Sequence, residues 1–153
     1  MPKITPFLWF DDQAEEAVNF YLSIFKSGKV LDIHRFNGKV LTVSFEVEGQ
    51  KFMGLNGGPL FKFTEAVSLF VNCETQEEVD DLWEKLSAGG TKDHCGWLKD
   101  KYGLSWQIIP KALMQLMGDP DPAKANAVMQ AMLKMNKIII ADLQKAHEGK
   151  TAA

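Results

Sequence analysis

The side chains that could carry out acid–base or metal chemistry are few in this chain, and they lie far apart. There are three histidines, His34, His94 and His147, and two cysteines, Cys73 and Cys95. The histidines do not follow a spacing typical of metal ligands. His94 and Cys95 are neighbours, but adjacent residues of a strand point to opposite faces, so without a bulge they would not bind one ion together. A surface histidine beside a packed cysteine is the simpler interpretation.

The candidate nucleophiles lack the partners that would activate them. No histidine is placed beside Ser68 or Ser105 by the sequence pattern, and the chain has no G-x-S-x-G elbow. Cys95 has Lys92 and Lys99 near it in sequence, and their positive charges would favour a thiolate. That neighbourhood alone does not establish a reactive cysteine, and we assign no catalytic residue.

A glycine-rich stretch, "NGGPLFKF" at residues 56–63, could form an anion site or a simple linker. Its glycines could offer backbone amides to an anion. The stretch matches neither phosphate-binding pattern, G-x-x-x-x-G-K-[ST] or G-x-G-x-x-G, followed by a helix. A linker turn is the preferred interpretation. Phe61 and Phe63 would then fold over the mouth of the trough that the predicted sheets, described below, are expected to form.

Composition and charge limit the function classes. The chain has 153 residues, 46% of them hydrophobic and 24% charged, with a net charge of −3, which is typical of a folded globular protein. That charge gives no electrostatic footprint for nucleic acid or an anionic membrane. No apolar run approaches the roughly 20 residues of a membrane span, and Asp11 follows the first apolar segment too soon for a signal peptide. The two cysteines match no disulfide framework, so we expect a reducing cytoplasm.

The first part of the chain predicts a strand, a helix and three more strands. In the helix, Val18, Tyr21, Leu22 and Phe25 recur at helical spacing. Asp12 and Glu15 resemble a capping box at its start, and Gly28 is expected to end it. The pairs Asn37-Gly38 and Glu48-Gly49 are expected to form the turns between the later strands. The predicted elements are the strand Ile4–Phe10, the helix Asp12–Phe25 and the strands Val30–Phe36, Val40–Val47 and Lys51–Asn56.

The same order of elements then repeats. Thr75 and Glu78 form a second capping box, and Gly89-Gly90 ends the second helix. The predicted elements are the strand Ala66–Asn72, the helix Thr75–Leu86 and short strands at Thr91–His94, Gly96–Lys99 and Leu104–Ile109. At an offset of 62 residues, the segment "EEAVNFY" that begins at Glu15 aligns with the segment "EEVDDLW" that begins at Glu77.

The repeat predicts an α+β fold. Each half is a βαβββ module, and two such modules together bury faces that neither would bury alone. We expect the two sheets to curve into an open trough of mixed strands with helices outside. The expected organisation is one domain over residues 1–153, with module 1 at about 1–60, module 2 at about 64–110 and a helical extension at about 111–153.

The extension predicts three helices. Residues Lys111–Met117 form the first, and Asp121 followed by Pro122 is a strong start signal for a second over Pro122–Met135. A third is expected over Ala141–His147. The second helix has an apolar side that neither module is expected to cover, which favours a homodimer interface. That side consists of Val128, Met129, Met132 and Leu133.

The chain resembles a known superfamily in four stretches: "ITPFLWFDDQAEEAVNFYLSIF", "GLNGGPLFKFTEAVSLFVNC", "CGWLKDKYGLSWQIIPKAL" and the tail "DPAKANAVMQAMLKMNKIIIADLQKA". They are similar to the vicinal oxygen chelate superfamily, which includes glyoxalase I, extradiol dioxygenases and bleomycin and fosfomycin resistance proteins. More closely, the chain resembles the PhnB-like subfamily, which is often labelled with the name of a demethylubiquinone 3-methyltransferase domain. The resemblance implies the paired-module fold and, for active members, a divalent metal ion held by side chains on several strands.

The positions that correspond to the superfamily's metal ligands hold unsuitable residues. The resemblance places them at Pro6, Ala66, Gln107 and either Met53, from the internal repeat, or Gly54, from the family pattern. Proline, alanine and glycine side chains carry no donor atom, and a hard divalent ion needs carboxylate or imidazole ligands. The strand "GLSWQIIP" thus has the shape of a metal-binding strand with an amide in place of a carboxylate. We therefore expect no metal and no cofactor.

Without a metal, strand alternation gives the trough a mostly apolar lining with a few polar groups, suited to a small hydrophobic or amphipathic ligand. Trp9 and Trp106 fall on the opposite parity and are expected to pack under the helices. The expected ligand-binding residues are Leu8, Phe10, Asn56, Ser68, Phe70, Trp97, Ser105 and Gln107. Filling of the core is the alternative for Phe10 and Phe70.

Two classes of function follow. The first is a binding protein that captures a small molecule, with no nucleic acid and no membrane as partner. The second is an enzyme, either a metal-free isomerase or lyase of the superfamily or, as the resemblance implies, a methyltransferase. The chain lacks a glycine-rich strand–loop–helix of the nucleotide-cofactor type.

Overall fold

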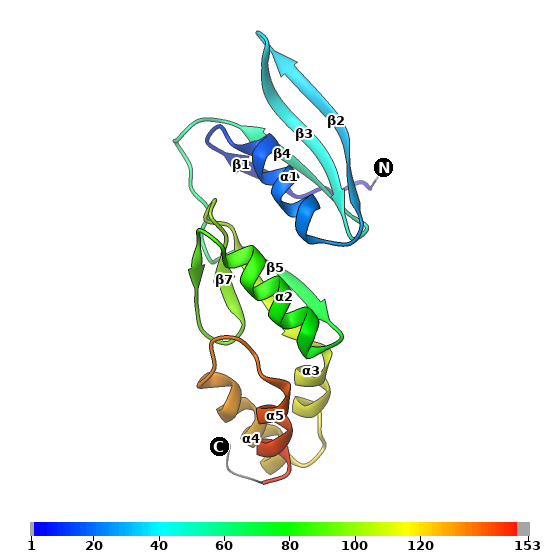
Figure 1. Cartoon of the computed structure of the whole chain (residues 1–153), viewed down its shortest axis with the longest axis vertical. Helices are drawn as coiled ribbons and strands as arrows, with labels where there is room; N and C mark the ends of the chain where they lie inside the picture. The colour runs from blue at the N-terminus through cyan, green and yellow to red at the C-terminus, as the bar shows by residue number, and fades with distance from the viewer. Residues whose placement is uncertain (1, 150–153) are drawn as a thin grey trace. The chain divides into compact units, whose positions relative to one another are not determined.

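A computed structural model describes residues 2–149 of the chain. It divides into two compact units, Met1–Thr64 and Glu65–Ala153, each built on one four-stranded sheet (Figure 1). We call these the first and second sheets. Among the described residues, no helix is long and apolar enough to span a membrane.

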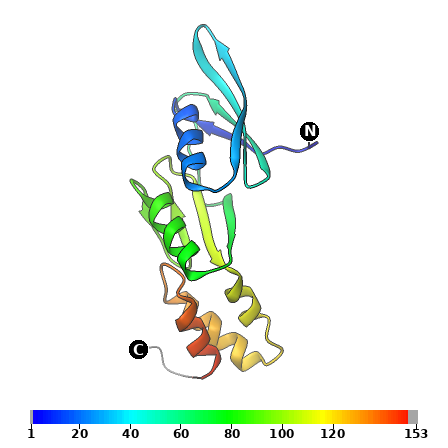
Figure 2. The ribbon, with the colours of Figure 1, turned by 45° about the vertical axis from the view of Figure 1, so that its right-hand side comes forward.

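The first unit is a βαβββ module. Its sheet has the order β1-β4-β3-β2, with β1 parallel to β4 and the other neighbours antiparallel. Helix α1 covers one face of this sheet (Figure 2). The elements are β1 (Phe7–Phe10), α1 (Ala14–Ile24), β2 (Gly28–Phe36), β3 (Lys39–Val47) and β4 (Gln50–Asn56).

Both predicted hairpin turns in the first unit are confirmed. Asn37 and Gly38 have φ angles of 52° and 77°, and Glu48 and Gly49 have 49° and 83°. Two consecutive left-handed residues are what a two-residue type I′ turn requires, because its twist matches that of the paired strands. These turns set the register in which β3 pairs with both β2 and β4.

The predicted cap of α1 is wrong. The N-cap residue is Gln13, and its side chain makes no capping hydrogen bond. Instead the amide of Ala14 donates to the side-chain Oδ1 of Asn56 at 2.8 Å. Asn56 ends β4 beside Phe10, so tertiary pairing brings a better-placed acceptor to the helix than Asp12 could supply locally. The helix ends at Ile24, one residue before the predicted end at Phe25, and Gly28 begins β2 instead of ending the helix.

The second unit repeats the module. Its sheet has the order β5-β8-β7-β6, the counterpart of β1-β4-β3-β2. Helix α1 begins at Ala14 and α2 at Gln76, which preserves the 62-residue offset. Thr75 caps α2 as predicted, accepting from the amide of Glu78 at 3.2 Å. The elements are β5 (Ser68–Cys73), α2 (Gln76–Ser87), β6 (Thr91–Lys92), β7 (Trp97–Lys99) and β8 (Ser105–Pro110).

Helix α2 buries one face of the second sheet. Its apolar side consists of Val79, Leu82, Trp83 and Leu86, all buried. The sheet residues Leu98, Trp106 and Ile108 are also buried, and Leu98 pairs with Trp106 in register. Trp106 is thus in the helix-packing core, as predicted. Because side chains alternate along a strand, the residues between these three point to the opposite face.

The C-terminal extension forms three helices that pack on the end of the second sheet (Figure 2). They are α3 (Lys111–Met117), α4 (Pro122–Leu133) and α5 (Ile140–His147). As predicted, Asp121 caps α4 and Pro122 occupies its first turn. The helices share one apolar cluster with the end of β8: Ile109, Leu113, Val128, Ile138 and Leu143, with Leu116, Met117, Met132 and Met135 packed against it.

This cluster corrects the expectation that the apolar side of α4 is uncovered. Val128 is fully buried and Met132 is partly buried by the chain itself. Only Met129 and Leu133 stay open, with 40% and 53% exposure. Periodicity identified the apolar side, but the contact with Ile109 depends on how the chain returns, which periodicity does not encode.

The return of the chain after α4 fixes the extension to the second unit. The amides of Cys95 and Gly96 donate to the carbonyls of Met135 and Asn136 at 2.9 and 2.8 Å. Gly96 is needed there because a Cβ would lie 2.8 Å from the side chain of Ile109. The same Cβ would lie 3.1 Å from the side chain of Ile138, so the extension leaves no room for a side chain at residue 96.

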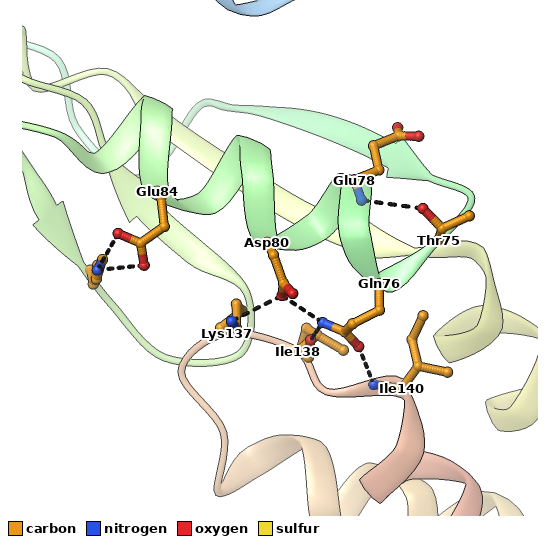
Figure 3. A network of polar contacts seen from close by, with 9 residues as sticks. Thr75, Gln76, Glu78, Asp80, Glu84, Lys137, Ile138 and Ile140 are labelled. Carbon is orange, nitrogen blue, oxygen red and sulfur yellow. Dashed lines mark hydrogen bonds and ion pairs between the residues drawn. The ribbon is translucent and has the colours of Figure 1, made fainter.

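A polar network around Gln76 holds the same return segment at the start of α2 (Figure 3). Its side-chain amide donates to Asp80 at 2.9 Å and to the carbonyl of Ile138 at 3.0 Å. Its carbonyl oxygen accepts from the amide of Ile140 at 2.7 Å. Lys137 forms an ion pair with Asp80 at 2.9 Å. One glutamine side chain thus satisfies two backbone groups of the extension.

Candidate functional site

The candidate site is the face of the second sheet opposite α2, which we call the open face. Strand register arranges its side chains in two rows. Ser68, Ser105 and Lys99 form the first row, because Ser68 pairs with Ser105 and Ser105 with Lys99. Phe70, Gln107 and Trp97 form the second row in the same way. A polar row therefore lies beside a row with an amide between two aromatic rings.

Gln107 and Ser68 connect the two rows. The side-chain amide of Gln107 donates to the hydroxyl of Ser68 at 3.0 Å. Phe70 is 47% exposed, and Trp97 is half-buried. Beyond this pair of rows Ile109 continues the face, but the extension covers it. The structure thus brings Ser68, Phe70, Trp97, Ser105 and Gln107 onto one face of one sheet.

The first row holds a covered hydroxyl and a cation. Ser105 is 1% exposed, and its Oγ has no hydrogen-bond partner among the described residues. Lys99 forms an ion pair with Glu65, which lies in the segment before β5. Their mutual hydrogen bond raises the pKa of Lys99 and lowers that of Glu65. Neither Lys99 nor Glu65 was among the predicted site residues, although alternation from Trp97 along β7 would have indicated Lys99.

Two predicted binding residues of the first unit lie on the other face from the one expected. Leu8 and Phe10 are 6% and 2% exposed. A Cβ at Gly54, the register partner of Leu8, would lie near both the ring of Phe10 and Ala14 of α1. Leu8 and Phe10 therefore pack under α1, and Trp9, which was expected under the helix, faces the other way. The parity counted from Pro6 was wrong by one residue, which turns every side chain of a strand to the opposite face.

Asn56 has a structural task. Its Oδ1 caps α1, and its Nδ2 donates to the carbonyl of Val40 at 3.1 Å. Asn56 thus stabilises the first unit.

The face of the first sheet away from α1 carries Phe7, which is 53% exposed, together with Trp9 and Met53.

The residues at the implied metal-ligand positions do not fit a divalent ion. Of the two alternatives in β4, Met53 pairs with Phe7 on the face away from α1, whereas Gly54 faces α1. Pro6 and Ala66 have no donor atom, and the amide of Gln107 already donates to Ser68. Within residues 2–149, no three His, Cys, Asp or Glu side chains converge on a point that could hold an ion. The donor set is a thioether and an amide, which hard cations bind poorly.

The glycine-rich stretch packs on its own unit. The amides of Gly57 and Gly58 donate to the carbonyls of Phe10 and Asp11 at 2.9 and 3.0 Å, so these two amides are not available to an anion. The indole of Trp9 donates to the carbonyl of Gly58 at 2.9 Å. Phe61 lies edge-on to Trp9 with ring centroids 4.9 Å apart. This geometry is that of a linker turn closed by aromatic contacts.

Phe63 makes the corresponding contact with Phe10, edge-on at 5.4 Å. Phe61 remains 60% exposed. The two rings of the linker thus pack against β1 of the first unit, one on each face of that strand.

The cysteines and histidines form no common site. Burial raises the pKa of the Cys73 thiol to about 12, with Glu78 adding to the shift, so this thiol is inert near neutral pH. Cys95 has a left-handed backbone, φ 59°, and is half-buried. His94 contacts the side chain of Asn136 at 2.7 Å, and His147 contacts Asp119 at 2.7 Å in the extension.

Comparisons with known proteins place the fold. The model of the family described as 3-demethylubiquinone-9 3-methyltransferase matches residues 2–109. Among solved structures, the chain is similar to a putative 3-demethylubiquinone-9 3-methyltransferase, PhnB protein, from Bacillus cereus. The two share 39% identity over 71% of this chain and 99% of that one, with a TM-score of 0.67. None of the curated proteins matches the chain.

Two more distant structures share the fold. One is protein PA1353 from Pseudomonas aeruginosa, with 17% identity over 72% of this chain and 98% of that one and a TM-score of 0.60. The other is the fosfomycin resistance protein FosX from Listeria monocytogenes, solved with Mn(II) and sulfate. It has 17% identity over 69% of this chain and 88% of that one, with a TM-score of 0.51. The family match ends at residue 109, so α3, α4 and α5 lie outside it.

Proposed function

This chain belongs to the PhnB-like family described as 3-demethylubiquinone-9 3-methyltransferase, and from that premise we propose that it binds a small amphipathic molecule on the open face of the second sheet. The observation that carries the proposal is the row Phe70–Gln107–Trp97, in which an amide lies between two aromatic side chains. Apolar surface with a few placed polar groups is the usual composition of a small-molecule site.

Gln107 supplies the polar group of the second row. Its hydrogen bond to Ser68 uses one N–H, and a side-chain amide has a second N–H and a carbonyl oxygen. Phe70 and Trp97 supply flat apolar surface beside it. A ligand with a ring and a hydrogen-bonding substituent would match both features at once.

We propose that binding needs no metal ion. The support is the chemistry of the ligand positions, where Pro6, Ala66 and Met53 replace the carboxylate or imidazole groups that a divalent ion requires. Gln107 then acts as a hydrogen-bonding group rather than as a ligand to an ion.

The test is a ligand screen by NMR on the full chain, using a set of small aromatic compounds. We expect resonances of Phe70, Gln107 and Trp97 to shift for at least one class of compound, equally with EDTA and with added Mn²⁺ or Zn²⁺. Gln107→Ala should weaken that binding, whereas Gln50→Ala, at the exposed start of β4, should not. Shifts confined to the first unit, or binding that requires a divalent ion, would contradict the proposal.

An enzyme is the second candidate, favoured by the description of the matched family. Methyl transfer or a metal-free isomerisation or lyase reaction would need a binding face of the same kind. Incubation with S-adenosylmethionine and a catechol or quinol, followed by mass spectrometry, separates the two candidates. A methylated product would establish the enzyme, and its absence with a compound that binds would favour the binding protein.

We also propose a homodimer and a cytoplasmic location. The apolar residues that α4 leaves open, Met129 and Leu133, support the dimer, although they are fewer than the sequence indicated. The free thiols of Cys73 and Cys95 support a reducing compartment. Light scattering on the purified chain tests the dimer, because a mass of 17.1 kDa at micromolar concentration would exclude it.

A further inference from the structure

We infer that the ligand of the open face is an aromatic carboxylate, and that Glu65 occupies the place of its carboxylate when no ligand is bound. This inference rests on the proposed function and narrows it to one chemical class. It depends on the first row of the open face, which holds Ser68, Ser105 and Lys99.

The polar row is suited to an anionic oxygen group. Lys99 contributes an ammonium, and its side chain is 35% exposed. The hydroxyl of Ser68 accepts from Gln107, which leaves its own O–H to donate elsewhere. The hydroxyl of Ser105 has no partner among the described residues. One cation and two hydroxyl donors in a single row match the acceptor-only chemistry of a carboxylate.

The unsatisfied hydroxyl of Ser105 indicates a missing partner. A buried polar group without a hydrogen bond is unfavourable, and native proteins contain few of them. Ser105 pairs directly with both Ser68 and Lys99, so a carboxylate bound to Lys99 would lie beside it. Because Ser105 is 1% exposed, a ligand carboxylate would satisfy its hydroxyl by displacing the side chains that cover it.

Glu65 already places a carboxylate on Lys99. The pair is exposed, with side-chain exposures of 35% for Lys99 and 59% for Glu65, and exposed ion pairs contribute little to stability. A ligand carboxylate can therefore replace Glu65 at small cost and gain the hydroxyls of the row in addition. Asp93 is the other acidic group that acts on Lys99.

The second row determines which apolar group the carboxylate ligand should carry. Residues two apart on a strand lie roughly 7 Å apart, so the two rows are separated by about the length of one aromatic ring with its carboxylate. A ring placed over Gln107 would lie between Phe70 and Trp97, where aromatic rings pack favourably at their edges and faces. The spacing therefore favours a single-ring acid over a long-chain fatty acid.

The test is a titration of the full chain with four probes, followed by calorimetry or NMR: benzoate, the neutral isostere benzamide, cyclohexanecarboxylate and inorganic sulfate. We expect benzoate to bind more tightly than the other three. Raising the salt concentration should weaken benzoate more than benzamide, because only the former uses a charge.

Two variants at the ion pair give opposite expected results. Glu65→Gln should strengthen benzoate binding, by up to about fivefold, since it removes a competitor worth at most the energy of an exposed pair. Lys99→Met should weaken it by about tenfold or more, in line with a hydrogen bond to a charged group, and Lys99→Arg should restore part of it. Circular dichroism confirms that each variant is folded.

The chain offers a matched control pair. Lys92 and Glu84 form another exposed ion pair in the same unit, at 2.9 Å. Lys92 pairs in register with Leu98, on the helix side of the sheet. Lys92→Met and Glu84→Gln make the same charge changes and should leave benzoate binding unaltered.

The outcomes separate the inference from the proposed function. Equal binding of benzoate and benzamide on the open face would keep the proposed function and overturn the carboxylate. Sulfate binding as tightly as benzoate would show a simple anion site and overturn the aromatic part. Weaker benzoate binding by Glu65→Gln would overturn the role of Glu65. Failure of every aromatic probe, charged or neutral, to shift the open face would contradict the proposed function itself.

Discussion

The indole N–H of Trp106 donates to the carboxylate of Asp100 at 2.9 Å in the interior of the second unit. Asp100 is 2% exposed, and its other oxygen accepts from the amides of Tyr102 and Leu104 at 2.9 and 3.0 Å. One buried carboxylate therefore fixes both the turn before β8 and a side chain of β8. Because Gln107 follows Trp106, this contact also orients the strand that carries the candidate site.

We expect Asp100→Asn to lower the free energy of unfolding by at least about 2 kcal/mol, because an amide cannot accept from all three donors with the strength of a carboxylate. Trp106→Phe should also lower it, because the change removes one of the three bonds and leaves a void in the core under α2. Urea denaturation followed by circular dichroism measures both. Asp81→Asn, which breaks the exposed pair with Lys85 on α2, is the control and should stay within about 0.5 kcal/mol of the parent.

Gly57 allows the linker to pass directly over Trp9. A Cβ at residue 57 would lie 2.4 Å from the indole ring, so Gly57→Ala should destabilise the first unit by about 1–3 kcal/mol through overpacking. Trp9→Ala in the same chain should relieve part of that loss, which makes the two effects non-additive. Strict additivity in denaturation experiments would show that the two residues do not meet.

Gln107→Glu should not create a metal site by itself. We expect a lower melting temperature, because the change removes the N–H that Ser68 accepts and places a carboxylate between two aromatic side chains. EDTA should leave the melting temperature of the parent chain unchanged. Elemental analysis checks the same point, and about one Zn, Ni, Mn or Fe per parent chain would contradict the expectation.

None of the single changes Pro6→His, Ala66→His and Gln107→Glu should create a metal site. Each single change supplies one ligand, and one ligand does not hold a hard divalent ion against water. Binding of Mn²⁺ by Gln107→Glu alone would show that other donors are present.

Gln76→Ala should loosen the extension while leaving α2 folded. The change removes the acceptor for the amide of Ile140 and the donor to the carbonyl of Ile138 (Figure 3). We expect faster amide exchange at the N–H of Ile140 and in the segment beside it. Gln130→Ala, on the exposed side of α4, is the control and should change neither.

The contact between the start of α2 and the segment after α4 should weaken in acid. Lys137 and Gln76 lower the pKa of the Asp80 carboxyl below its ordinary value. A lowered pKa means that this contribution is fully present above the unfolded value, about 3.9, and is lost as the pH falls through the lower folded value. Protection factors, which are exchange rates corrected for the intrinsic effect of pH, should therefore fall more between pH 6 and pH 3 in the parent than in Asp80→Asn.

Substitutions at two neighbouring residues of α4 distinguish a role in folding from a role in a dimer interface. Met132 packs in the cluster of the extension, so Met132→Glu should destabilise the extension at any protein concentration. Leu133 is 53% exposed, so Leu133→Glu should leave the fold intact and reduce the mass in solution only if α4 lies in a dimer. A parent chain that is monomeric, or a Leu133→Glu variant that stays dimeric, would remove α4 from the interface.

Local signals predicted the elements well because they depend on local chemistry. The turns at Asn37-Gly38 and Glu48-Gly49, the Thr75 cap and the Asp121-Pro122 start each involve residues a few positions apart. The predictions that failed depend on distant residues. Asn56 replaces Asp12 as the cap of α1, from 42 positions away, and no local pattern contains that pairing.

The candidate site was predictable only where the register had a secure reference. In β8, Gln107 fixed the parity, and Ser105 and Trp106 fell on the expected faces. In β1 the reference was Pro6, which lies outside the strand, and the assignment of Leu8 and Phe10 was wrong. Lys99 and Glu65 were missed because their pairing joins β7 to a segment that precedes β5 in the chain.

The second module depends on the extension for some of its own contacts. In a shorter chain ending near residue 109, the amides of Cys95 and Gly96 would lose the carbonyls of Met135 and Asn136, and Ile109 would lose its apolar cover. Removing α3, α4 and α5 would therefore cost stability whatever they contribute to the ligand. The three helices are part of what folds the second module, because its own backbone amides and apolar surface depend on them.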